Sequence, residues 1–265
     1  MKKFTLPTSA LRIAFPLARI KRPAMPSLTK STLIPTVAAL LCLVVVALPN
    51  AASAYNAAGD FTLSNNPNGV WSYGWSVTLG STFHLDTNNT TAAYGQNGVD
   101  GWLSGLSPEG IPSVLYNTNP TQSFTAPTIA IQPGQLVLNP NNGNYAVLRW
   151  TAPSAGLFNI TATFSGVSSA PGGDSVDVHI LDNGILIFDS TVNGSPSPTT
   201  YSGIQNLAQG ATIDFAVGYG SDGSDHEDVT ALAATIVPEP STVLLTISGL
   251  LSLLCLRKRI ANTSR

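Results

Sequence analysis

The sequence has only two cysteines, Cys42 and Cys255, and both lie in apolar segments near the ends of the chain. The long middle region therefore has no cysteine, which excludes a disulfide scaffold and a cysteine-ligated metal there. Basic residues are almost as scarce in that region. Of the twelve Lys and Arg residues, seven precede Tyr55 and four follow Pro240, which leaves Arg149 alone.

The acidic residues are distributed in the opposite way. All fourteen lie between Asp60 and Glu239, so this region has a formal net charge of −13, although the whole chain has only −2. Nucleic-acid binding is excluded because the phosphate contacts need Lys and Arg. So many carboxylates repel anionic polymers, attract divalent cations and keep an exported protein soluble.

Recognisable catalytic motifs are also missing. The sequence has no Gly-x-Ser-x-Gly elbow, no His-Glu-x-x-His and no P-loop. A glycosidase needs two opposed carboxylates, and Glu109 and Glu227 are the only glutamates before Glu239. Aspartates are plentiful, but no spacing selects a pair. We predict a protein that is not an enzyme, with a glycan-active hydrolase as the less favoured alternative.

Residues 1–54 have the pattern of a secretory signal peptide. A basic region with seven Lys and Arg residues precedes an apolar run from Leu33 to Leu48. Ala52 and Ala54 then supply the small residues that signal peptidase needs, so the mature chain is expected to begin at Tyr55. Translation from either Met1 or Met25 leaves a complete signal.

Residues 238–265 have three consecutive parts, namely a Pro-Glu-Pro tripeptide, an apolar run over 242–256 and a basic cluster. The run is about as short as a membrane helix can be, and the basic cluster is expected to stay cytoplasmic. The tripeptide lacks two backbone donors, so we expect neither a strand nor a helix to continue through it. The sequence thus predicts a C-terminal transmembrane helix that holds residues 55–237 outside the membrane.

This tail resembles the PEP-CTERM sorting signal of Gram-negative bacteria. The resemblance rests on six residues and their order at the end of the chain: Pro238, Glu239, Pro240, Arg257, Lys258 and Arg259. It implies that an exosortase cuts near the motif and delivers the protein to the cell surface or to a polysaccharide-rich extracellular matrix. The six residues after Arg259 make this tail slightly longer than is usual in the family.

Residues 55–237 have single-domain length and an all-β pattern. Short alternating runs between Gly, Pro and Asn turns predict strands at 70–79, 128–131, 135–138, 144–151, 157–165, 175–181, 185–189, 211–218 and 229–237. The Asn183-Gly184 pair predicts a type I′ hairpin turn. Many short strands without helices predict a single antiparallel β-sandwich, jelly-roll-like in type.

Parts of this region resemble a module of exported proteins in planctomycete-type bacteria, where it accompanies the same sorting tail. The matching pieces are 66–74, 148–153, 177–179, 183–184 and 213–218. The resemblance implies a single sandwich and bacterial export, and it brings no catalytic residues.

An acidic loop at 222–228 is the best candidate for a cation site. Asp222, Asp225 and Asp228 recur at every third residue, and calcium prefers such oxygen-rich, glycine-containing loops. The spacing is not that of an EF-hand. A solvated loop between two strands is the simpler interpretation.

Aromatic residues offer the second candidate site. Trp71, Tyr73 and Trp75 share one face of a strand, which we interpret mainly as core, with sugar stacking as the alternative. Trp102 lies in a loop-like stretch and is predicted to be an exposed, ligand-binding aromatic. Arg149 is predicted to pair with a carboxylate. The sequence predicts a non-catalytic surface or matrix protein, and it leaves open whether the protein binds carbohydrate or is purely structural.

Overall fold

The computed structural model describes residues 53–170, 175–221, 223–239, 249 and 252–253. All of the predicted signal peptide except Ser53 and Ala54 lies outside these residues, including Ala52, and so do Pro240 and the basic cluster Arg257, Lys258 and Arg259. Within the described ranges, no helix is long and apolar enough to cross a membrane.

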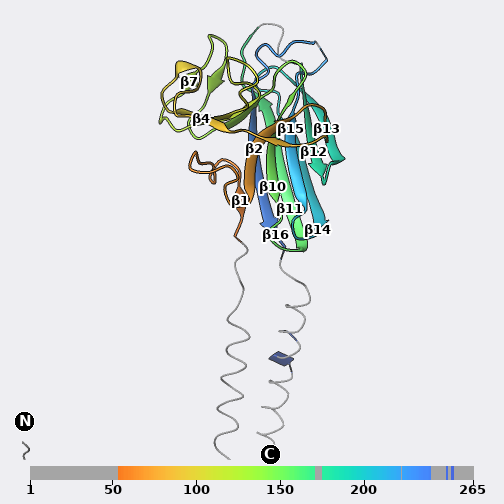
Figure 1. Cartoon of the computed structure of the whole chain (residues 1–265). Helices are drawn as coiled ribbons and strands as arrows, with labels where there is room; N and C mark the ends of the chain where they lie inside the picture. The colour runs from red at the N-terminus through yellow and green to blue at the C-terminus, as the bar shows by residue number, and fades with distance from the viewer. Residues whose placement is uncertain (1–52, 171–174, 222, 240–248, 250–251, 254–265) are drawn as a thin grey trace, which may run out of the picture. The chain divides into compact units, whose positions relative to one another are not determined.

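Two antiparallel sheets face each other (Figure 1). The first has the order β14-β11-β16-β9-β6-β5-β4, and β1 pairs with the far end of β16. Its strands are β1 (Tyr55–Asn56), β4 (Asn88–Thr90), β5 (Val99–Leu103), β6 (Ser113–Asn117), β9 (Leu136–Asn139), β11 (Gly156–Gly166), β14 (Thr199–Leu207) and β16 (Thr230–Pro238).

The second sheet has the order β13-β12-β15-β10-β2-β3. Its strands are β2 (Trp71–Ser76), β3 (His84–Leu85), β10 (Tyr145–Thr151), β12 (Ser175–Asp182), β13 (Ile185–Asn193) and β15 (Thr212–Val217). A separate hairpin joins β7 (Ser123–Phe124) to β8 (Ala130–Ile131), and a short 3-10 turn, η1, spans Ala93–Gly95. The predicted all-β class with antiparallel sheets is confirmed.

The main core lies between the two sheets. Alternate side chains of both sheets point inward, and Trp71, Tyr73, Trp150 and Phe158 are among the largest that are fully buried. The core interpretation of the aromatic stripe is therefore confirmed for Trp71 and Tyr73. Trp75, at the end of the stripe, is only half-buried, and its ring stacks on His84 with 4.4 Å between the centroids.

The single basic residue of the described chain has the partner that its acidic surroundings predict. Arg149 donates from Nε and Nη2 to the two carboxylate oxygens of Asp214, at 2.6 and 2.8 Å. Its guanidinium also lies 4.2 Å from the ring centre of Phe83. Both groups of the ion pair lie on the outer face of the second sheet, where the chain after β2 crosses and covers it.

The predicted hairpin turn is confirmed as well. Asn183 and Gly184 both have positive φ, at 48° and 78°, as a type I′ turn requires. Other predictions were incomplete, because β5, β6 and β14 lie in stretches that were not assigned to strands.

The prediction that no strand continues into the Pro-Glu-Pro motif was wrong for its first residue. Strand β16 includes Pro238, which pairs with Phe158, and the Glu239 N–H donates to the Leu157 carbonyl at 2.8 Å. Residues alternate along an antiparallel strand, so the nitrogen of Pro238 points away from β11 and no ladder bond is lost there. The first two motif residues are therefore part of the folded sheet.

Candidate binding pocket

A pocket of about 570 Å³ lies at the loop end of the sandwich. Its polar lining comes from separate segments: η1, the loop after β5, the end of β9 and the loop between β15 and β16. These side chains are Tyr94, Glu109, Asn139, Asp225, His226 and Glu227. The β7–β8 turn adds Thr128 and an apolar wall that includes Ile129, and Val229 lies beside it.

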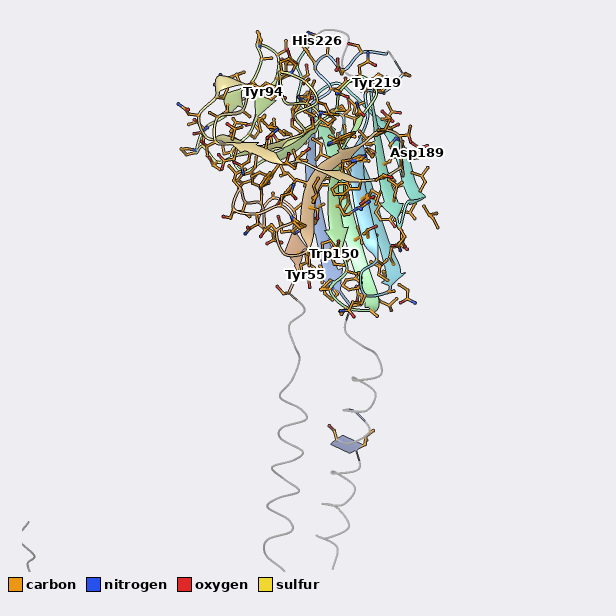
Figure 2. All side chains as sticks on the ribbon, viewed as in Figure 1. Tyr55, Tyr94, Trp150, Asp189, Tyr219 and His226 are labelled. Carbon is orange, nitrogen blue, oxygen red and sulfur yellow. The ribbon has the colours of Figure 1, made fainter. Side chains whose placement is uncertain are left out.

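The pocket is far from the points where the chain enters and leaves the sandwich, near Tyr55 and Pro238. Figure 2 shows Tyr94 and His226 at one end of the domain and Tyr55 at the other. Tyr55 pairs with Ile236, two residues before Pro238. The two predicted processing sites are therefore neighbours on the sheet, and the pocket opens at the opposite end.

Glu227 is the most firmly held acid in the pocket. Hydrogen bonds from the hydroxyls of Ser168 and Thr128, one to each oxygen, hold the pKa of Glu227 below its ordinary value. Its carboxylate therefore stays charged, which suits a hydrogen-bond acceptor better than a general acid. A glycosidase acid needs a raised pKa instead.

Tyr94 supplies a neutral phenol beside these charges. Burial raises the pKa of Tyr94, and its hydroxyl accepts a hydrogen bond from Asn139 Nδ2 at 2.6 Å. Asp225 is fixed from another direction, because its Oδ2 accepts the backbone N–H of Asn142 at 2.8 Å. The polar groups are thus oriented by contacts within the protein.

Two residues that line the pocket also have strained backbone conformations. Three non-glycine residues of the described chain have positive φ, and two of them, Tyr94 at 52° and Glu227 at 71°, line this pocket. The third, Asn183, occupies the hairpin turn. Such conformations are unfavourable for residues with a Cβ and occur preferentially at functional sites.

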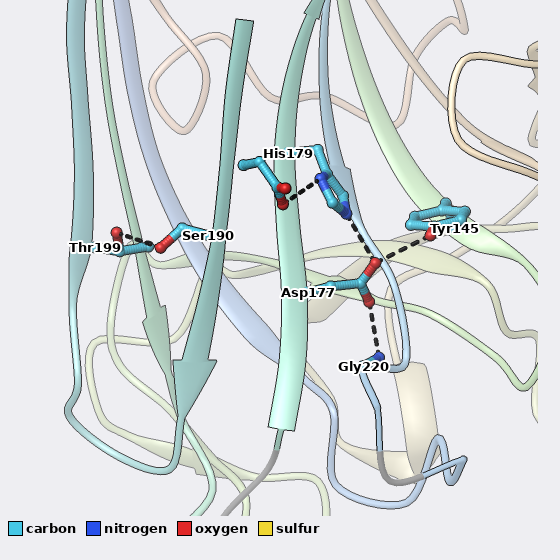
Figure 3. Close-up of polar contacts among 7 residues, drawn as sticks. Tyr145, Asp177, His179, Ser190, Thr199 and Gly220 are labelled. Carbon is cyan, nitrogen blue, oxygen red and sulfur yellow. Dashed lines mark hydrogen bonds and ion pairs between the residues drawn. The ribbon is translucent and has the colours of Figure 1, made fainter. Parts of the chain in front are cut away.

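A second polar cluster anchors the loop that carries Asp225, His226 and Glu227 (Figure 3). Asp177 Oδ1 accepts the Gly220 N–H at 2.7 Å. The other oxygen, Oδ2, accepts from the Tyr145 hydroxyl at 3.0 Å and lies 2.8 Å from His179 Nε2.

The hydrogen bonds in this cluster also set the charge of Asp177. Burial acts to raise the pKa of Asp177, but the bonds from His179, Gly220 and Tyr145 together lower it below its ordinary value. The cluster is therefore built around a charged carboxylate. It serves to position one wall of the pocket.

The prediction that Trp102 is exposed was wrong. Trp102 lies on β5, is only 5 % exposed and stacks nearly parallel to Tyr73 in the core. Its Nε1 donates to the Thr62 carbonyl at 2.8 Å. Asp100 and Gly101 gave the segment a loop-like composition, but Gly101 pairs with Leu115 inside the sheet.

The calcium prediction stays a prediction. Asp222 lies outside the described residues, Asp225 lines the pocket, and Asp228 is buried beneath the loop. Across the parts of the chain that the structure describes, no group of three acidic or histidine side chains is arranged to hold a metal ion.

No protein-family model matches the chain, and no curated protein matches it. A module named CBM51 from Clostridium perfringens GH95, solved with methyl-galactose, is 14 % identical, with 70 % of this chain and 99 % of that chain covered and a TM-score of 0.34.

Two further solved structures show how broad these similarities are. A family 35 carbohydrate-binding module from Clostridium thermocellum is 18 % identical, with 38 % and 76 % of the two chains covered and a TM-score of 0.27. Rabbit GITRL is 19 % identical, with 36 % and 71 % covered and a TM-score of 0.25. These TM-scores are too low to assign the ligand of any of these proteins to this chain.

Proposed function

We propose that this chain is an exported, non-catalytic surface or matrix protein whose jelly-roll-like sandwich binds a carbohydrate in the pocket at its loop end. The observation that supports this best is the pocket itself. Its volume falls in the range of small-molecule sites, and it combines oriented carboxylates, a phenol and an amide with an apolar wall.

The chemistry of the pocket favours an uncharged sugar. Carboxylate oxygens accept hydrogen bonds from sugar hydroxyls, and such charge-assisted bonds are stronger than neutral ones. Glu227 and Asp225 supply these acceptors, while the Tyr94 hydroxyl can donate. The same carboxylates, in a domain of net charge −13, repel uronic acids and sulfated sugars.

The position of the pocket agrees with presentation at a surface. Signal peptidase is expected to cut before Tyr55, and an exosortase near Pro238 and Glu239, at the end of the sandwich opposite the pocket. A membrane-anchored intermediate therefore has its pocket directed away from the lipid. Mass spectrometry of the protein recovered from its host tests both cuts, because intact ends would contradict this sorting.

Sugar binding is tested on a glycan array and by polysaccharide pull-down with the full chain, in calcium and in chelator. Asp225→Asn and Glu109→Gln are expected to weaken binding at least about tenfold. Asp182→Asn, at the end of β12 beside the distant hairpin turn, is the matched control and should bind normally. Binding that survives both pocket variants would place the ligand elsewhere, and binding lost only in chelator would support the predicted calcium.

One observation keeps the hydrolase as a second candidate. The two glutamates that precede Glu239, Glu109 and Glu227, both line this pocket. An assay for reducing ends, on every polysaccharide that the protein binds, separates the two functions. Turnover that Glu227→Gln abolishes would show an enzyme, whereas binding without turnover agrees with our proposal.

A further inference from the structure

One edge of the first sheet lacks the features that usually protect an exposed strand. Free edges expose unpaired backbone groups, and natural proteins shield them by shortness, charge, proline or bulges. Strand β14 has nine residues, Thr-Thr-Tyr-Ser-Gly-Ile-Gln-Asn-Leu, with no charge and no proline. It pairs with β11 on one side and is the last strand in the sheet order (Figure 1).

The other edges of the two described sheets are shielded. Strands β3 and β4 have only two and three residues. Strand β13 carries the exposed Asp189, and its pairing with β12 contains a register shift between Ile180 and Leu181. Among these four outer strands, β14 is the one that is long, regular and uncharged.

The pairing along the sheet shows which groups of β14 are free. The Glu239 N–H donates to the Leu157 carbonyl. The backbone N–H and C=O groups of the odd-numbered residues of β11 therefore point toward β16, and those of its even-numbered residues point toward β14. The register pairs Ile160 with Gly203, so the odd-numbered residues of β14 bond to β11. Its even-numbered residues direct their N–H and C=O groups outward: Thr200, Ser202, Ile204 and Asn206.

These outward groups are self-complementary. When a second copy is placed antiparallel with Gly203 opposite Gly203, Thr200 faces Asn206 of the second copy and Ser202 faces Ile204. The two-fold symmetry repeats each pairing, so four doubly hydrogen-bonded pairs form, with eight bonds in all. These bonds use every outward N–H and C=O group of the four residues on both strands. Neighbouring registers leave some of them unpaired.

Gly203 suits the centre of this arrangement. It forms the non-hydrogen-bonded pair, where the two strands come closest. A Cβ at this position would lie 2.4 Å from the hydroxyl oxygen of Tyr201, so glycine is needed to let the Tyr201 ring lie over it.

We propose that two copies of this chain associate through β14, so that their eight-stranded sheets become one continuous sheet. The charge distribution favours this edge, since two domains of net charge −13 repel each other over most of their surface. The side chains on the outer face beside β14 are uncharged, among them Asn159 and Thr161 of β11 and Thr235 of β16. This association is independent of the proposed sugar binding.

The first test blocks the edge without breaking the fold. Ile204→Pro removes an outward N–H that has no role within the sheet, a position where edge strands tolerate proline. Sedimentation equilibrium of the full chain, in density-matched detergent, should show a dimer whose dissociation constant rises at least about tenfold in this variant. Thr235→Ser, on the same face but away from the edge, should dimerise like the wild type.

Salt provides a second readout on the same samples. Screening weakens the repulsion between the two acidic domains, so the wild-type dimer should tighten as the salt concentration rises. A wild-type chain that stays monomeric at every salt concentration would overturn the proposal. So would a dimer that Ile204→Pro leaves equally tight, because the apolar ends of the chain would then be the cause.

Disulfide trapping tests the register even if the proline variant fails to fold. In a chain with Cys42→Ser and Cys255→Ser, a Ser202→Cys protein mixed with an Ile204→Cys protein should cross-link rapidly, since directly opposite residues are within reach of a disulfide. Thr161→Cys replaces Ile204→Cys as the control and should cross-link slowly. Equal rates in the two mixtures would refute the register.

Discussion

The buried carboxyl group of Asp86 provides the sharpest test of the packing. Asp86 follows β3, is 1 % exposed, and its two side-chain oxygens have no hydrogen-bond partner among the described residues. Its backbone is fully used, because its N–H donates to the Tyr73 carbonyl and its own carbonyl accepts from Asn66. Burial raises the pKa of Asp86 from 3.8 to about 8, so at neutral pH the group is an uncharged acid.

The sign of the pH effect follows from proton binding. Between pH 4 and pH 8 the folded protein keeps a proton on Asp86 that the unfolded chain releases, so the free energy of unfolding falls as the pH rises. Each pKa unit corresponds to about 1.4 kcal/mol. Ionisation of Asp86 does not lower the free energy of unfolding below about pH 4. By about pH 8 it has lowered this free energy by on the order of 5 kcal/mol.

Asp86→Asn removes this titration with almost no change of shape. The stability of the variant relative to the wild type should therefore rise by about 1.4 kcal/mol per pH unit between pH 5 and pH 8. Urea unfolding followed by tryptophan fluorescence measures it in the full chain, because all four tryptophans lie in the sandwich. Thr87→Ser is a neutral neighbouring control, and a difference between Asp86→Asn and wild type that stays constant with pH would refute a neutral, buried Asp86.

Three further changes have expected outcomes. Arg149→Met leaves the buried carboxylate of Asp214 without its ion pair, so urea unfolding should show a loss of about 3 kcal/mol, most of which Asp214→Leu restores in the double variant. Gly220→Ala places a Cβ 1.2 Å from a backbone carbonyl oxygen; it should abolish sugar binding in a pull-down while circular dichroism still shows the sandwich. Trp102→Phe loses the hydrogen bond to the Thr62 carbonyl and should cost about 1 kcal/mol in the same unfolding assay.

The sequence predicted those features of the fold that depend on local patterns. Alternation along strands such as β10 and β12 indicated the all-β class, and Asn183-Gly184 indicated its turn, because neighbouring residues alone determine these signals. The partner of Arg149 was predictable in kind, since a single cation among fourteen acids finds a carboxylate. That Asp214 is this partner depends on the pairing of β10 with β15, which no local pattern encodes.

The wrong and missing predictions share a cause. Strand β5 contains Gly101 and β14 contains Gly203, and glycine is unfavourable in strands unless the surroundings require it. The inward face of β14 itself carries Thr199, Gly203 and Gln205, and Asp100 lies on the same face of β5 as Trp102. Neither segment therefore shows a clear alternation of apolar and polar residues. Trp102 was therefore placed in a loop, and β14 was not predicted.

The pocket was beyond the reach of sequence reasoning for another reason. Tyr94, Asn139 and Glu227 come from distant segments, and only the packing of η1 and β9 against the β15–β16 loop brings them together. Glu109 and Glu227 were noted as the only two glutamates before Glu239, yet nothing in their spacing indicated that they share a site. The positive φ angles of Tyr94 and Glu227 are a consequence of the tertiary structure and leave no sequence signal.

The two proposals, taken together, limit where dimerisation can occur. Antiparallel pairing of β14 with its copy orients the two sandwiches in opposite directions, so the pocket of one copy lies toward the chain ends of the other. Two copies anchored by their tails in one membrane cannot adopt this arrangement, and association must follow release of at least one of them. The released dimer carries pockets at both ends and can bridge two polysaccharide chains. Wild-type protein should therefore agglutinate polysaccharide-coated beads, whereas Ile204→Pro should bind single beads equally well without agglutinating them. Agglutination by both proteins would show that the bridging does not depend on pairing through β14.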